Sequence, residues 1–384
     1  MPKENPNWIL KILHITCWYP NLENPQEALW IKRHIEALEL FCSNEVYHVE
    51  VKPSNKLRIE TKSLFQNTRT IRILAPIKHW FIIEIISSVL ASWVLICKRK
   101  KFDAIIFHIA YPNLTFIPKV PLNKPFFVIE HWSAYNLNFG VENQDKLIRI
   151  KRIFWNKNLQ LTTVSRALGE DIKKFSDKYD LNYHVVPNVV DTNVFFNMGM
   201  EINENQFYMV SSWKEPKDPF KVIKAFSSLV KEMPGLSLRI GGYGQQIQDM
   251  STLVQKLRLG DNVCFLGLQK PEQIALEMNR ARAFLHCSEY ETFSVVCAEA
   301  LCCGCPVIAS ERGGIKELVE PEYGILVDKN DVNSWLKNLE SFLTSKQLFN
   351  RSKISADNCK KFNHEKIGDD YFKFLSQKID SDNK

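Results

Sequence analysis

Two glutamates separated by seven residues are the part of the sequence best suited to chemistry. Glu291 and Glu299 lie in the stretch SEYETFSVVCAEALCCGCPVIASERGG, residues 288–314. The preceding run RAFLHCS is typical of a buried strand, and the run after Ser294 is typical of a helix with Ser294 as its N-cap. A helix N-terminus offers free N–H groups and a positive dipole end, which suit a phosphate. Carboxylates beside a phosphate repel it unless they accept hydrogen bonds from hydroxyls, so the pattern indicates a ligand that joins sugar hydroxyls to phosphate.

Strands and helices alternate along the chain, and this alternation predicts the fold class. Apolar runs that read as strands, each with a loop at its C-terminal end, occupy 8–16, 103–112, 125–132, 159–165, 183–191, 207–213, 236–244, 263–269, 282–288, 306–310 and 323–328. We predict an α/β protein with two doubly wound, Rossmann-like domains, in which parallel sheets are covered on both faces. Ligands of such domains bind at the C-terminal ends of strands, here in the cleft across which the two domains are expected to face one another.

Length and one polar stretch set the expected domain boundaries. The 384 residues, 45% of them apolar, exceed a single typical core and suit two domains. The polar stretch NMGMEINENQ, residues 197–206, is the natural linker. We therefore expect an N-terminal domain over 1–196 and a C-terminal domain over 197–362.

Composition bears on partners and compartment. Fifty Lys and Arg residues stand against 43 Asp and Glu, a net charge of +7. This small excess of positive charge does not require a nucleic-acid partner. It is equally compatible with an anionic membrane surface or a phosphorylated substrate. The N-terminal segment shows no signal peptide, and the ten cysteines are too scattered for a small disulfide scaffold. We expect a cytoplasmic protein with reduced thiols and no nucleic-acid partner.

One apolar stretch is a candidate for membrane contact. Residues 79–101, HWFIIEIISSVLASWVLICKRKK, are near the length that spans a bilayer, but Glu84 and three serines interrupt them. The favoured interpretation is a buried helix that ends in a solvated basic turn. The alternative is a monotopic contact, in which Trp80, Phe81 and Trp93 and the basic run 98–101 touch anionic lipid.

The longer stretch SEYETFSVVCAEALCCGCPVIASERGGIKELV resembles the signature of retaining glycosyltransferase family 4, whose members have the GT-B fold. The positions that match are Glu291, Glu299, Gly304, Pro306, Val307, Gly313, Gly314 and Glu317. Weaker family landmarks, among them VIEHWSAYN and VVPNVVDTNVF, follow in the family's order, so the resemblance covers nearly the whole chain.

The resemblance implies that the C-terminal domain binds a nucleotide-diphosphate sugar and the N-terminal domain an acceptor. Glu291 would bond the donor sugar hydroxyls and Glu299 the nucleotide ribose. The backbone N–H groups expected near the sugar and diphosphate belong to Phe293, Ser294 and Val295. The resemblance also implies that a last helix, within 363–384, returns to the N-terminal domain.

Two further residues receive roles from the resemblance. Lys217, in SSWKEPKDP, matches the lysine that neutralises the leaving diphosphate, and His131, in VIEHWS, matches a histidine beside the reacting sugar. The alternative for Lys217 is a surface lysine. The alternative for His131 is a structural histidine, and the same two interpretations apply to His108.

Three positions depart from the family pattern and fall at the expected donor site. Ser212 stands where many members carry an arginine, so Arg166 or Arg239 would have to supply that cation. Ala28 replaces a glycine of the first loop. The usual Gly-Phe-Gly after the first glutamate is Thr-Phe-Ser, beginning at Thr292.

Two motifs have alternative interpretations: a C-x-x-C could indicate a metal site, and a G-x-G could indicate a dinucleotide site. Cys302 and Cys305 form a C-x-x-C, with His286 nearby in sequence, but buried apolar thiols are the more usual case. The turn 241–247 contains a G-x-G without the third glycine of the NAD fingerprint. We expect no required metal and no cofactor, the nucleotide sugar being a substrate.

The sequence and the resemblance together predict a metal-independent, retaining glycosyltransferase of hexosyltransferase type. Its acceptor is expected to be a glycan or a lipid-linked glycan of surface polysaccharide synthesis, reached at the inner face of the membrane. The departing phosphate would take the acceptor's proton, because no second carboxylate nucleophile is evident. The alternatives are a nucleotide-sugar epimerase of the same fold and a catalytically silent nucleotide-sugar-binding subunit, which Ser212 would permit.

Overall fold

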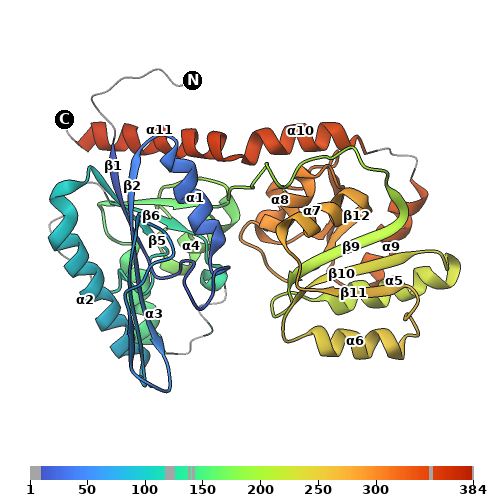
Figure 1. Cartoon of the computed structure of the whole chain (residues 1–384), viewed down its shortest axis with the longest axis horizontal. Helices are drawn as coiled ribbons and strands as arrows, with labels where there is room; N and C mark the ends of the chain where they lie inside the picture. Colours follow the sequence, from blue (N-terminus) through green and yellow to red (C-terminus); the bar gives the residue numbers. More distant parts are fainter. Residues whose placement is uncertain (1–9, 117–125, 137–139, 141–142, 346–348, 383–384) are drawn as a thin grey trace. The chain divides into compact units, whose positions relative to one another are not determined.

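The computed structural model describes residues 10–116, 126–136, 140, 143–345 and 349–382. It divides the chain into two compact units, which we describe separately. The N-terminal unit comprises Met1–Val189 together with His364–Lys384, and the C-terminal unit comprises Val190–Asn363 (Figure 1).

The N-terminal unit is built on an eight-stranded sheet of order β3-β4-β2-β1-β5-β6-β7-β8. Its strands are β1 Lys11–Thr16, β2 Ser43–Pro53, β3 Arg58–Glu60, β4 Thr68–Ala75, β5 Ala104–His108, β6 Phe126–Glu130, β7 Leu159–Thr163 and β8 Tyr183–Val185. All neighbouring strands are parallel except β3, which runs antiparallel to β4. The prediction of wholly parallel sheets is therefore wrong at this edge. Strand β3 pairs only with β4, and seven residues link the two, too few for the crossover that a parallel neighbour needs.

The helices of this unit are α1 Leu29–Glu39, α2 Trp80–Lys98, η1 Arg99–Lys101, η2 Ser133–Tyr135, α3 Gln144–Ile153, α4 Arg166–Ser176 and α11 His364–Asp382. The last helix, α11, packs on α1 and on the sheet, where Tyr371 and Leu375 join the apolar cluster around Ile106 and Phe127. Gly368 permits this close approach, because a Cβ there would lie 2.1 Å from the carbonyl oxygen of Ala37.

The C-terminal unit has a six-stranded sheet of order β11-β10-β9-β12-β13-β14, and every pair of neighbours is parallel. Its strands are β9 Asn203–Ser212, β10 Ser237–Tyr243, β11 Val263–Gly267, β12 Ala281–His286, β13 Val307–Ser310 and β14 Gly324–Val327. The unit already begins at Val190, and β9 begins at Asn203, within the stretch 197–206 that we expected as the linker.

The helices of this unit are α5 Pro219–Glu232, α6 Ile247–Lys256, α7 Pro271–Arg280, α8 Val295–Cys302, η4 Gly313–Glu317, α9 Val332–Thr344 and α10 Arg351–Phe362. Helix α5 contacts both α6 and α9, and together they cover one face of the sheet, with Phe226 and Trp335 in the core. Helix α8 contacts α7 and α10 on the other side (Figure 1). The prediction of two doubly wound α/β domains is confirmed.

Candidate active site

The carboxylate of Glu291 lies in a cluster of three polar side chains at the C-terminal end of β12. His286, the last residue of β12, has its Nε2 atom 2.8 Å from Oε1 of Glu291. The same Oε1 accepts a hydrogen bond from the ammonium of Lys217, which forms an ion pair with it. The three side chains are largely buried, with exposed fractions of 18% for Lys217, 12% for Glu291 and 2% for His286.

Backbone bonds between two loops bring Lys217 to Glu291. The strands β9 and β12 are neighbours in the sheet, so the loops that follow them begin side by side. Lys217 and Ser288 form an isolated antiparallel bridge. On either side of it, the N–H of Asp218 donates to the carbonyl of Cys287 over 3.1 Å, and the N–H of Glu289 donates to the carbonyl of Pro216 over 2.9 Å. The cluster is thus fixed by main chain as well as by charge.

Burial sets the protonation states within this cluster. Burial, and secondarily the charge of Lys214, lowers the pKa of Lys217 to about 8. The ion pair with the carboxylate of Glu291 stabilises the charged ammonium. Burial, and secondarily the charge of Lys217, lowers the pKa of His286 well below its usual range. His286 is therefore neutral, and a hydrogen bond to a carboxylate requires the tautomer with the proton on Nε2.

A glycine turn supports the loop that carries Glu291. The N–H of Gly314 donates to the carbonyl of Glu291 over 2.8 Å. A Cβ on Gly313 would lie 2.0 Å from that same carbonyl oxygen, and a Cβ on Gly314 would lie 2.2 Å from the carbonyl oxygen of Thr292. Gly313 also has a φ of +53°. Only glycine allows this approach, so the Gly-Gly pair fixes the backbone of Glu291 and Thr292.

Helix α8 begins directly after this loop. Ser294 is its N-cap residue, as predicted, but its φ of 74° is left-handed and its side chain makes no capping hydrogen bond. The N–H groups of the first turn, starting at Val295, are those that a helix leaves without intrahelical partners. Glu299 lies one turn inside α8 and is buried. The ring of Phe293 is buried edge-on against Phe362, so that side chain packs the core and only its backbone is suited to a ligand.

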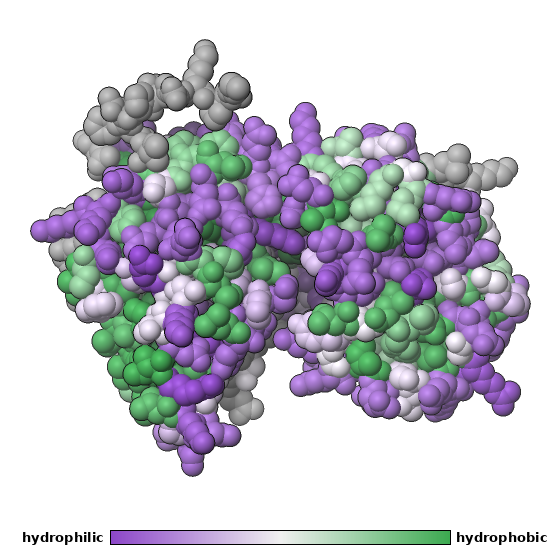
Figure 2. Space-filling model, viewed as in Figure 1, coloured by the Kyte–Doolittle hydropathy of each residue, from purple (hydrophilic) through white to green (hydrophobic). Residues whose placement is uncertain are grey.

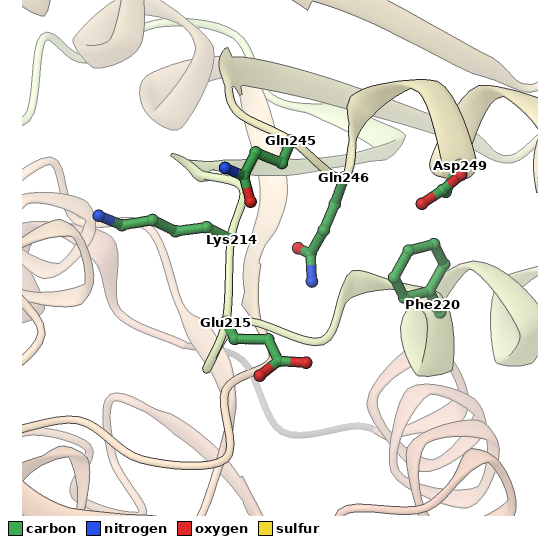
Figure 3. Close-up of a pocket in the computed structure, with 6 residues that line it drawn as sticks. All are labelled: Lys214, Glu215, Phe220, Gln245, Gln246 and Asp249. Carbon is green, nitrogen blue, oxygen red and sulfur yellow. The ribbon is translucent and has the colours of Figure 1, made fainter. Parts of the chain in front are cut away.

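A cavity of about 560 Å³ lies beside this loop system, after the ends of β9 and β10. Its lining residues are Lys214, Glu215, Phe220, Gln245, Gln246 and Asp249 (Figure 3). Gln246 connects the cavity to the cluster, because its Nε2 donates to the carbonyl oxygen of Lys217 over 3.0 Å. Neither this cavity nor the pairing of His286 with Glu291 was predicted from the sequence. The only available signal for His286 was its position at the end of a strand.

The structure places Ser212 apart from Arg166 and Arg239. These are the two arginines expected to replace the cation that many family members carry at position 212. Ser212 ends β9 and is half-buried, and its carbonyl accepts from the N–H of Lys214 over 2.9 Å. Arg239 makes a bidentate ion pair with Glu277, over 2.7 and 2.8 Å, and is thus engaged elsewhere. Arg166 begins α4 in the N-terminal unit. Lys214 is therefore the cation nearest in sequence to Ser212 that lines the cavity.

His131 follows β6 in the N-terminal unit and belongs to a group of buried histidines. Its Nδ1 lies 3.1 Å from Oδ1 of Asn188, and Nε2 of His34 lies 3.2 Å from the same oxygen. The ring of His131 stacks with that of His108 at 6.3 Å, and His108 Nε2 lies 2.9 Å from His14 Nδ1. Burial lowers the pKa of all four, so the group is neutral. The structure describes His131 within this unit, whereas Glu291 and Lys217 belong to the other.

The cysteines of the C-x-x-C motif are buried free thiols. Burial raises the pKa of Cys305, and a hydrogen bond with Cys359, followed by burial, raises the pKa of Cys302. Within the described part of the chain, no group of three or more His, Cys, Asp or Glu residues is placed to hold a metal ion.

Comparison with known proteins gives a family match for the C-terminal unit. Residues 192–361 match the family model described as glycosyl transferases group 1. The chain is 25% identical over 222 residues to N-acetyl-alpha-D-glucosaminyl L-malate synthase of Bacillus anthracis, in an alignment of 55% of this chain and 54% of that protein. It is 24% identical over 294 residues to an N-acetylgalactosaminyltransferase of Campylobacter jejuni that acts on a diphospho-undecaprenol, covering 73% of this chain and 78% of that one. The chain spans about half the length of the first of these relatives.

Solved structures extend the comparison to the fold of the whole chain. Sucrose-phosphate synthase from Thermosynechococcus elongatus superposes with a TM-score of 0.74 at 18% identity, over 97% of this chain and 100% of that one. Anabaena HepE in complex with UDP superposes with a TM-score of 0.72 at 18% identity, over 96% and 100%. These similarities, with the two Rossmann-like sheets, show that the chain has the two-domain GT-B fold.

Proposed function

We propose that this GT-B protein is a retaining glycosyltransferase of family 4 that transfers a hexose from a nucleotide-diphosphate donor to a glycan or lipid-linked glycan. The observation that carries the proposal is the cluster of Lys217, Glu291 and His286 directly before the N-terminus of α8. It combines a hydroxyl-binding carboxylate, a buried cation and free helix N–H groups, the groups that a sugar diphosphate requires.

The proposed reaction follows from these charges. The anomeric carbon–oxygen bond breaks, and its electron pair leaves with the diphosphate. The acceptor oxygen bonds to the anomeric carbon on the same face, and the acceptor's proton goes to a departing phosphate oxygen. Lys217 and the N–H groups of Phe293, Ser294 and Val295 would stabilise the negative charge that develops on the diphosphate. Neither a metal ion nor a cofactor has a required role in this scheme.

Glu291 and Glu299 position the donor in this proposal. Glu291 accepts hydrogen bonds from the sugar hydroxyls, and His286 holds its carboxylate in place. The ammonium of Lys217, which pairs with Glu291 in the ligand-free protein, turns to the diphosphate when the donor binds. Glu299 accepts from the ribose. Thr292, in the loop that carries Glu291, and Ser212, at the end of β9, would contact the donor.

His131 would act on the acceptor side of the reacting sugar. Its Nε2 atom is buried and has no hydrogen-bond partner, which supports a role in receiving a ligand hydroxyl. Asn188 holds the opposite ring nitrogen and so orients the ring.

The names of related proteins support the substrate classes. HepE has been solved with UDP and with UDP-glucose, and the Campylobacter relative is named for an undecaprenol-linked acceptor. For this chain we propose a nucleotide-sugar donor and a glycan or lipid-linked acceptor of surface polysaccharide synthesis, with the protein in the cytoplasm at the inner face of the membrane.

Donor binding and turnover test the proposal in two steps. The melting temperature of the protein, measured with UDP, GDP or ADP, should rise with one of the three nucleotides, because a ligand that binds only the folded state stabilises it. Incubation with UDP- and GDP-sugars and a glycan acceptor should then release nucleoside diphosphate and extend the acceptor. An altered sugar without transfer would indicate the epimerase, and binding without turnover would indicate the silent subunit.

Replacement of one glutamate, with its neighbour as a control, tests the site. Glu291→Gln should lower kcat/KM by roughly 100-fold or more, because it removes a charged acceptor at the reacting sugar. Glu289→Gln is the matched control, since Glu289 lies two residues earlier, is about half exposed and pairs with Lys221. Equal activity of the two variants would contradict the proposed site.

A further inference from the structure

Helix α2 is oriented with its polar side chains toward the protein. Glu84 is fully buried, accepts from Tyr111 Oη over 3.1 Å and pairs with Arg149 over 3.0 Å. The Oγ of Ser88 donates to the carbonyl of Pro112 over 3.2 Å and accepts from the N–H of Phe116 over 3.1 Å. These bonds fix the first half of α2 to the N-terminal unit.

The opposite face of α2 is apolar and exposed. Its exposed large side chains are Trp80, Phe81, Ile82, Ile85, Val89, Trp93 and Ile96. From Ile82 onward these positions recur at intervals of three and four, so they form one stripe along the helix. Figure 2 shows a hydrophobic area at the lower left, where Figure 1 draws α2. A surface helix of a soluble protein normally has the reverse arrangement, and an exposed apolar patch of this kind marks an interaction site.

Cations border this apolar stripe at both ends. Lys78 precedes the helix, and Lys100 and Lys101 follow it, all three exposed. Between Lys78 and Lys101 the sequence contains one acidic residue, the buried Glu84. The neighbouring helix α3 adds Lys146, whose Nζ lies 4.9 Å from the ring centroid of Trp80. The border of the stripe is therefore basic, which complements an anionic surface.

The bonds and charges around α2 also distinguish between the possible partners of its exposed face. In the described residues, α2 is long and apolar enough to cross a membrane by length and composition alone, but 39% of its most apolar window is buried and its polar side is bonded to the unit. It cannot leave the unit to span a bilayer without breaking these bonds. A second copy docked symmetrically on this face would bring basic helix ends together in either orientation, since both ends carry lysine.

We propose that the exposed face of α2 lies in the surface of an anionic bilayer. Val89, Trp93 and their apolar neighbours enter the acyl boundary, Trp80 and Phe81 lie at the headgroup level, and Lys78, Lys100 and Lys101 contact the phosphates. This attachment does not depend on the proposed reaction. The favoured expectation of a wholly buried helix is wrong, because Val89, Trp93 and Ile96 are more than half exposed.

Vesicle flotation of the full-length protein tests the attachment without donor or acceptor. The wild type should float with vesicles of equal parts phosphatidylglycerol and phosphatidylcholine, bind less to phosphatidylcholine alone, and release partly at high salt. The double variant Val89→Glu/Trp93→Glu should lose binding by about tenfold or more, because two exposed apolar anchors become charged. Lys100→Glu/Lys101→Glu should weaken binding to anionic vesicles selectively.

Controls separate lipid binding from other effects. Leu268→Glu, at a residue 74% exposed on the C-terminal unit, should float like the wild type. All variants should retain the wild-type melting temperature, because the changed side chains are exposed. The proposal is overturned if the wild type binds neither vesicle, or if Val89→Glu/Trp93→Glu floats like the wild type. It is equally overturned if this variant only converts a dimer to a monomer, since the face would then join two copies.

Discussion

At the scale of single residues, the candidate site contains a buried lysine, Lys217, whose pKa lies close to neutral pH. In the proposed reaction Lys217 must be charged to stabilise the leaving diphosphate, yet burial lowers its pKa to about 8. Its ion pair with Glu291 keeps it protonated in the free protein. A lysine in this position therefore couples activity to pH, whereas an arginine would not.

The first prediction concerns this coupling. In the free enzyme, kcat/KM should fall with rising pH above about 8, by about tenfold per pH unit, because the ammonium of Lys217 loses its proton. Lys217→Arg should lower activity but move the falling limb to higher pH, since a guanidinium stays charged. Lys217→Ala should cost roughly 100-fold to 1,000-fold at neutral pH. An unchanged profile in Lys217→Arg would assign the limb to another group.

At the scale of elements, two turns rather than one helix define the site. The Gly-Gly pair that begins η4 supports the backbone of Glu291, and the loop after β9 supports Lys217. Both contacts join segments that are distant in sequence but begin at neighbouring strand ends. The site is thus a property of the parallel sheet, whose strand order brings β9 beside β12.

Gly314→Ala tests the support from the Gly-Gly turn. The new Cβ would meet the backbone carbonyl of Thr292 at 2.2 Å, so the loop must shift, at a cost of roughly 1–3 kcal/mol. We expect a lower melting temperature and a weaker thermal response to the nucleotide. Gly260→Ala is the matched control, because nothing lies within 4 Å of its added Cβ. Similar behaviour of the two variants would mean that the turn does not hold the loop.

The elements also show where sequence reasoning succeeds and where it stops. Continuous apolar runs such as AIIFH and FFVIE identified β5 and β6, because strands buried on both faces are apolar throughout. Strand β4 was missed, since it contains Arg72, which is buried only because Glu50, Glu60 and Glu23 pair with it. The orientation of α2 could not be predicted either. Glu84 interrupts the apolar pattern in the sequence, and its burial is explained only by its ion pair with Arg149, which is distant in sequence.

At the scale of the whole molecule, the two units differ in their content of buried histidine. The N-terminal unit buries His14, His34, His48, His108 and His131, whereas the C-terminal unit buries His286. Burial is the largest cause that lowers the pKa of each of them, and no buried histidine gains a charge by folding. Most of the expected acid sensitivity therefore belongs to one unit.

We predict that low pH destabilises the N-terminal unit before the C-terminal unit. His14 and His34 have pKa values of about 4 in the folded protein, against 6.5 when unfolded. Stability is thus retained above pH 6.5 and falls below it, by about 1.4 kcal/mol per pH unit for each histidine, because the unfolded chain binds the extra protons. Glu130, with its pKa raised to about 7, acts in the opposite direction between pH 4.5 and 7 and offsets about one histidine. Hydrogen exchange at pH 7.5 and pH 5 should show protection lost first around β1, β5 and β6 rather than β9 and β12.

A single substitution isolates the effect of one histidine. Burial and the charge of Arg72 lower the pKa of His48 to about 3. His48→Leu should therefore raise the free energy of unfolding at pH 5 relative to the wild type by more than at pH 7.5, as measured by urea denaturation. His79→Gln is the control for loss of a histidine at the surface, since His79 is exposed. If His48→Leu changes stability equally at both pH values, the neutral buried form of His48 does not contribute to the weakness in acid, which contradicts the prediction for this residue.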